Sequence, residues 1–155
     1  MSDLLVKLYD LPTAAAGVDS RVEIRKPIGP ESRLVVEWIL GEFGQAWAAE
    51  AQVALGNRPQ TLHLAIEAGR PVGFACFDAT LRGFFGPIGV AASVRGRGVG
   101  AALLQASLVD MRAVGYGYAI VGAAGAPEFF RRCAGATEIP GSEPGVYRGI
   151  LRSDA

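Results

Sequence analysis

The chain has 155 residues, half of them hydrophobic and 19% charged, which is the composition of a globular protein with a hydrophobic core. Its 15 basic and 15 acidic residues cancel to a formal net charge of zero, whereas proteins that bind nucleic acid carry a basic excess. We therefore predict one domain over residues 1–155 and no nucleic-acid partner.

The N-terminus and the cysteines bear on where the protein works. Asp3 comes early and only a short apolar stretch follows, which is not the pattern of a signal peptide. No apolar run approaches the roughly 20 residues that cross a bilayer. Cys76 and Cys133 are too few for a disulfide framework, so free thiols are favoured over a single disulfide. We expect a cytoplasmic protein with no membrane partner.

The first third of the chain predicts two strands and two helices. Residues 4–9 predict a short edge strand, and a loop completes the N-terminal segment of residues 1–20. Apolar and charged residues alternate over residues 22–25, as in a half-buried strand. Two short helices, or one broken helix, are expected over residues 31–40 and 45–55. One face of the first helix carries four apolar side chains at helical spacing: Leu34, Val35, Trp38 and Ile39.

The middle of the chain predicts three strands and a long helix. Residues 62–68 and 72–78 flank a glycine–proline turn and predict a hairpin. A third, apolar strand covers residues 83–92, and Gly86-Pro87 within it predicts an irregularity, since proline cannot donate to the ladder. An amphipathic helix covers residues 99–114. Its apolar face is predicted from helical spacing: Val99, Ala102, Leu103, Ala106, Val109 and Ala113.

The last third predicts a buried strand over residues 118–121, a short helix over residues 127–133 and a final strand over residues 145–151. The full order is that of an α/β domain with a mixed sheet. Its central strand–loop–helix unit needs an explanation of its own.

That loop reads Arg95-Gly96-Arg97-Gly98-Val99-Gly100. Glycines let backbone N–H groups approach a ligand closely, and the start of a helix adds unpaired donors and partial positive charge. Arginine adds full charges that suit phosphate. The loop is therefore a predicted anion site.

Two other phosphate loops compete with this assignment. A nucleoside-triphosphate loop needs a lysine after its last glycine, and none follows Gly100. Gly96, Gly98 and Ala101 satisfy a dinucleotide fingerprint, but no acidic residue ends the next strand, where the ribose would be bound.

Residues 90–104 closely resemble the pyrophosphate motif of the GNAT superfamily of acyl-CoA-dependent N-acyltransferases, through Arg95, Gly98 and Gly100. Residues 22–40 look like the first strand and helix of that family, and the middle strands and the Phe129-Phe130 helix follow in its order. The resemblance implies a mixed, mostly antiparallel central sheet flanked by about four helices. It also implies an acyl-CoA cleft where two neighbouring parallel strands, here those near Val90 and Tyr118, diverge.

The resemblance further implies an N-acetyltransferase that moves an acetyl group from acetyl-CoA to a primary amine of a small molecule or peptide, by direct attack in a ternary complex and without a metal. The cofactor-binding residues that it implies are Ile88, Val90, Arg95, Gly96, Arg97, Gly98, Val99, Gly100 and Ala101.

The acid and base are harder to assign. Residues 83–92 and 118–124 hold no carboxylate, although the family often places a base on these strands. The position of the family's tyrosine acid is taken by Phe130, or by Phe129 within the error of the alignment. Four candidates remain, each with a structural alternative: Asp78, Tyr147, Glu42 and Glu50. The single histidine, His63, is expected to be structural.

A second function is therefore kept open, a catalytically silent domain that binds or senses acyl-CoA. The two functions differ in turnover and not in binding. An exposed edge strand would also permit a homodimer.

Overall fold

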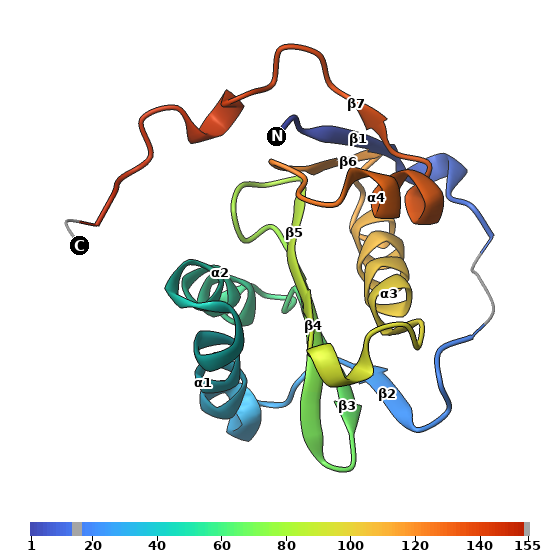
Figure 1. Cartoon of the computed structure of the whole chain (residues 1–155), viewed down its shortest axis with the longest axis vertical. Coiled ribbons are helices and arrows are strands. Elements are labelled where there is room, and N and C mark those ends of the chain that lie inside the picture. Colours follow the sequence, from blue (N-terminus) through green and yellow to red (C-terminus); the bar gives the residue numbers. More distant parts are fainter. Residues whose placement is uncertain (14–16, 154–155) are drawn as a thin grey trace.

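The computed structural model describes residues 1–13 and 17–153; residues 14–16 of the predicted N-terminal loop lie outside this part. A seven-stranded sheet in the order β2-β3-β4-β5-β6-β1-β7 forms the centre. Helices α1 (Ser32–Phe43) and α2 (Gln45–Gly56) cover one face, and α3 (Val99–Ala113) and α4 (Pro127–Ala134) cover the other (Figure 1). The sheet thus separates two hydrophobic cores.

The sheet is mixed and mostly antiparallel, as predicted. Among the strands of the described residues, only β5 and β6 pair in parallel, and β2 and β7 form the two edges. The strands are β1 (Leu4–Lys7), β2 (Val22–Arg25), β3 (Leu62–Glu67), β4 (Arg70–Phe77), β5 (Phe84–Val90), β6 (Tyr118–Val121) and β7 (Thr137–Glu138).

The parallel pair β5–β6 is short. Phe84 pairs with Ile120 and Phe85 with Val121, after which β6 ends while β5 continues to Val90. The register of β5 against β4 also shifts in this region, where Gly86-Pro87 predicted an irregularity. Most of β5 therefore has no β6 partner along this edge.

The shift also changes which face each β5 residue uses. Phe85 and Ile88 pack in the core beneath α3, whereas Gly89 lies under Phe43 of α1. A Cβ atom on Gly89 would lie 2.7 Å from the Phe43 ring and 2.9 Å from Phe74, so only glycine fits there.

Two strand predictions are wrong. β1 is not an edge strand, because it pairs with β6 on one side and β7 on the other. Residues 145–151 form no strand, since β1 already occupies the place beside β6. They hold a 3-10 turn at Gly145–Tyr147, positive φ angles at Gly145 and Gly149, and a Leu151 that is 96% exposed.

The predicted buried faces of α1 and α3 are partly wrong. In α1, Val35 and Ile39 are buried but Leu34 is 56% exposed, because α2 shares the coverage of this sheet face. In α3 the buried residues are Val99, Leu103, Leu104, Ser107, Leu108 and Met111. Val109 and Ala113 of the predicted face are exposed, since the contacts of α3 with the sheet and α4 bury a stripe that runs through Leu104, Leu108 and Met111 instead.

Both cysteines are free thiols, as predicted, and burial raises the pKa of Cys76. Among the helices of the described residues, none combines the length and apolar character that crossing a bilayer requires.

Candidate functional site

The glycine loop between β5 and α3 presents its backbone. Gly96 and Gly98 both have a φ of 79°, in the left-handed region that glycine adopts without strain. No atom lies within 4 Å of the place where a Cβ on Gly96 would stand. The N–H of Ala102 bonds to Gly98 O at 3.1 Å, so the N–H groups of residues 99–101 have no partner one helical turn earlier. This backbone geometry suits an anionic ligand.

Arg95 is exposed beside this loop. Its Nε donates to the carbonyl oxygen of Val90 at 3.4 Å, and it takes part in none of the ion pairs formed by the described residues. Its positive charge is therefore available to a ligand of the loop.

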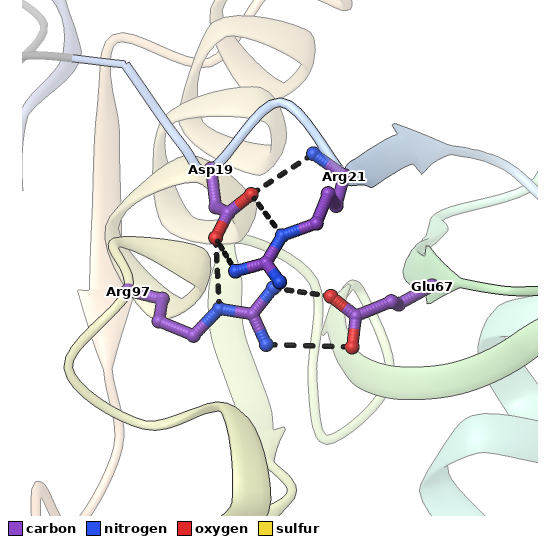
Figure 2. Close-up of polar contacts among 4 residues, drawn as sticks. All are labelled: Asp19, Arg21, Glu67 and Arg97. Atoms are coloured by element: carbon purple, nitrogen blue, oxygen red, sulfur yellow. Dashed lines mark hydrogen bonds and ion pairs between the residues drawn. The ribbon is translucent and has the colours of Figure 1, made fainter.

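Arg97, which the sequence placed among the cofactor-binding residues, bonds to two carboxylates of the chain (Figure 2). Its Nε donates to Asp19 Oδ2 at 3.1 Å, Nη1 donates to Glu67 Oε1 at 3.4 Å, and Nη2 donates to Glu67 Oε2. Arg21 holds the same Asp19 carboxylate, with Nη2 at 2.7 Å from Oδ2. The hydrogen bonds from Arg97 lower the pKa of Glu67.

The two phenylalanines of α4 have different surroundings. Phe130 is buried and its ring centroid lies 6.1 Å from that of Phe85. Phe129 is half-buried beside the first turn of α3, where a Cβ on Gly100 would lie 3.6 Å from its ring and 3.7 Å from Val90. Phe129 is thus the phenylalanine next to the glycine loop.

Asp78 occupies the turn between β4 and β5, with a φ of 53°. One carboxylate oxygen accepts from Gly83 N at 2.8 Å, and both accept from Tyr116 Oη at 2.9 Å. Burial and this contact raise the pKa of Tyr116. The Asp78 carboxylate is thus already used to stabilise the turn.

Tyr147, by contrast, lies within the electrostatic influence of one other candidate, Glu50. Its hydroxyl oxygen lies 2.8 Å from where a Cβ on Gly122 would stand, just past the end of β6. Burial raises the Tyr147 pKa, and the carboxylates of Glu50 and Asp3 raise it further. Thr80 in the β4–β5 loop donates a hydrogen bond to Glu50 of α2. Glu42, on α1, is exposed.

No sequence pattern indicated several of these contacts. Thr80 is a single threonine in a loop, and Asp19 and Glu67 resemble ordinary surface carboxylates. Asp3 is buried and accepts from Ala123 N at 2.8 Å, which fixes the chain just after Gly122.

His63 lies against α3, and its Nδ1 is 3.4 Å from Ser107 Oγ. Burial lowers its pKa, so the neutral ring is favoured in this packed position. The described residues contain no cluster of three or more His, Cys, Asp or Glu side chains able to hold a metal ion.

Comparisons with known proteins bear on this site. The model of the acetyltransferase (GNAT) family matches residues 32–135. A GCN5-related N-acetyltransferase from Sphaerobacter thermophilus superposes with a TM-score of 0.70 at 23% identity, over 89% of this chain and 48% of that one. A GCN5-related N-acetyltransferase from Kribbella flavida superposes with a TM-score of 0.61 at 23% identity, over 88% of this chain and 53% of that one.

A glucosamine N-acetyltransferase region of a fungal multi-domain GH3 β-N-acetylglucosaminidase gives a TM-score of 0.68 at 17% identity, over 89% of this chain and 19% of that one. These identities show a shared fold. The chain spans about half, or less, of the length of these structures. No curated protein sequence matches the chain.

Proposed function

The chain belongs to the acetyltransferase (GNAT) family, and from this premise we propose that it transfers an acetyl group from acetyl-CoA to a primary amine of a small molecule or peptide. The observation that carries the proposal is the glycine loop, whose left-handed Gly96 and Gly98 expose backbone N–H groups beside the unpaired Arg95. The reaction would take place in the cytoplasm, by direct attack of the amine in a ternary complex.

The residues around the loop fit a CoA pyrophosphate. The N–H groups of residues 99–101 would donate to phosphate oxygens, and Arg95 would add a charged contact. Ile88 and Val90 lie on the part of β5 that has no β6 partner, so their backbone groups can pair with the amides of the pantetheine arm. Acetyl-CoA supplies the acetyl group in activated form, as a thioester.

Two side chains are proposed to move protons. Tyr147 stands where β5 and β6 separate, and its raised pKa keeps the phenol protonated at neutral pH. It would therefore donate a proton to the departing sulfur. Glu50, oriented by the hydroxyl of Thr80, would accept the proton that the amine loses. Asp78 is a weaker candidate because its carboxylate already accepts from Gly83 and Tyr116.

A base matters most for a strongly basic acceptor. Deprotonating a lysine-type amine of pKa about 10.4 at pH 7 costs about 4.6 kcal/mol, whereas an α-amine of pKa about 7.8 costs only about 1 kcal/mol. Negative charge from Glu50 and Asp3 around Tyr147 would attract the ammonium form of either acceptor.

The competing function is a silent domain that binds acyl-CoA without turnover. It is favoured by one observation: β5 and β6 carry no carboxylate, and phenylalanine occupies both positions that match the family's tyrosine.

Calorimetry with acetyl-CoA tests the proposal first. Gly96→Glu places a carboxylate in the predicted phosphate site and should abolish binding. Gly141→Glu is the matched control, because Gly141 also has a positive φ, 72°, and no atom within 4 Å of a Cβ, but lies after β7. Equal effects of the two variants, or no binding by the wild type, would overturn the proposed site.

Release of free CoA thiol from acetyl-CoA in the presence of a panel of amines then tests turnover. Tight binding with no amine-dependent release would favour the silent domain.

A further inference from the structure

We infer that Arg97 is a positioning residue: it fixes the glycine loop by bridging Asp19 and Glu67, and it leaves Arg95 as the side chain that binds phosphate. The identity of the ligand rests on the proposed function. The bridge itself rests only on contacts within the chain.

Arg97 joins three separate segments (Figure 2). Asp19 precedes β2, Glu67 is the last residue of β3, and Arg97 lies within the loop. The guanidinium bonds to both carboxylates, and the Arg97 carbonyl oxygen also accepts from Asp19 N at 3.4 Å. The residues before Asp19 also pack on the loop, since a Cβ on Gly98 would lie 3.7 Å from Val18 Cα.

The charges of this network cancel. Two arginines, Arg21 and Arg97, meet two carboxylates, Asp19 and Glu67. A neutral cluster attracts a phosphate much less than a free cation does. Arg95, two residues away, is exposed and has no carboxylate partner among the described residues.

The loop has a reason to need such a bridge. With Gly96, Gly98 and Gly100 in close succession, its backbone has more conformational freedom to lose than a segment of the same length without glycine. A loop held in its binding conformation before the ligand arrives avoids that loss on binding. Glu67 and Asp19 would thus increase affinity for an anion despite their negative charge.

The two roles of Arg97 predict opposite effects for one variant. Glu67→Gln removes the negative charge that the Nη1 and Nη2 atoms of Arg97 contact. If Arg97 were a phosphate ligand, acetyl-CoA would bind more tightly to this variant. If Arg97 is a bridge, binding weakens, as it does in Arg97→Met.

The double variant Arg97→Met with Glu67→Gln sharpens this comparison. Both changes break the same interaction, between Arg97 and Glu67. The affinity of the double variant for acetyl-CoA should therefore be no lower than that of the single variant with the lower affinity. Arg95→Met should weaken binding about 10- to 100-fold, the range of a hydrogen bond to a charged group. Its effect should add to that of Glu67→Gln. Tighter binding by Glu67→Gln overturns the inference.

A second measurement needs no cofactor. Hydrogen exchange at the loop should be faster in Arg97→Met and in Glu67→Gln than in the wild type, and it is read at the amides of Asp19 and Ala102, which bond to the loop carbonyl oxygens of Arg97 and Gly98. Glu31→Gln is the matched control, because Glu31 also accepts two bonds from an arginine, Arg25, at 2.8 Å each, but lies at the start of α1. Its loop should exchange at the wild-type rate.

Unchanged loop exchange in Arg97→Met would overturn the bridge. Failure of the wild type to bind acetyl-CoA would instead overturn the proposed function, and the exchange experiment would still decide the bridge.

Discussion

The hydroxyl oxygen of Tyr147 lies so close to Gly122 that a Cβ atom on Gly122 would be 2.8 Å away. This contact places a phenol from the end of the chain at the point where β5 and β6 separate.

Gly122→Ala should displace Tyr147 and lower kcat, because its methyl group would also lie 3.0 Å from Phe84. The affinity for acetyl-CoA should stay near that of the wild type. Steady-state kinetics and calorimetry check this. The control is Gly117→Ala, just before β6, where a Cβ meets no atom within 4 Å. Equal kcat values in the two variants would contradict the role of the contact.

Tyr147→Phe should lower kcat about 10²-fold, as expected for loss of a general acid. Because the Tyr147 pKa is raised above its ordinary value of 10.0, the acid form persists through the neutral and mildly alkaline range. The wild-type kcat should therefore show no loss from this group below about pH 10. An unchanged kcat in Tyr147→Phe would contradict the assignment.

Glu50→Gln should lower kcat with lysine-type amines more than with α-amines, since the more basic acceptor depends more on a base. Thr80→Val should act in the same direction, because it removes the hydroxyl that orients Glu50. Glu42→Gln, on the exposed surface of α1, serves as the control. A uniform effect of Glu50→Gln on all amines would favour a binding role.

Gly89→Ala should destabilise the fold by about 1–3 kcal/mol, because its Cβ would overlap the rings of Phe43 and Phe74 in a packed core. Gly41→Ala should instead stabilise α1 by about 0.5–1 kcal/mol, since Gly41 is helical and its Cβ would stand in open space. Urea unfolding measures both. A Gly89→Ala variant as stable as the wild type, or more stable, would show that the packing around Gly89 is looser than the contacts indicate.

The Arg97–Glu67 pair should also affect stability as a function of pH. The pKa of Glu67 is lowered from an ordinary value of 4.5 by Arg97. A lowered folded-state pKa adds stability that is complete above the ordinary value and is lost as pH falls towards the lowered one. The stability difference between wild type and Arg97→Met should therefore shrink as pH falls from about 6 to about 2.

Urea midpoints across this range measure the difference. Arg33→Met is the control, because Arg33 and Glu37 are both exposed and 3.9 Å apart, so the pair contributes little. A difference that grows at low pH would contradict the sign of the Glu67 shift.

Several elements were predictable from the sequence because their signals are local. Alternation over four residues defined β2 with its observed bounds, Val22–Arg25. The glycine loop and the start of α3 at Val99 were likewise visible, because positive φ and helix initiation depend on neighbouring residues. The family resemblance rested on the same loop, and the family model confirms it.

Pairing between distant segments was not predictable. An apolar stretch does not indicate which strand it will pair with. No local pattern therefore showed that β1 would pair with β6 and that residues 145–151 would stay outside the sheet. Helical spacing likewise gives one direction of burial, whereas α3 is covered from two sides.

The candidate site was predictable only in part, for the same reason. Glycine spacing predicted an anion site, because the backbone geometry of such a site belongs to one short stretch of the chain. The partners of Arg97 lie 78 and 30 residues away, at Asp19 and Glu67, and Thr80 reaches Glu50 across 30 residues. Charges and hydroxyl groups interact through space, so only the tertiary structure decided which arginine remains free for a ligand and which side chains surround Tyr147.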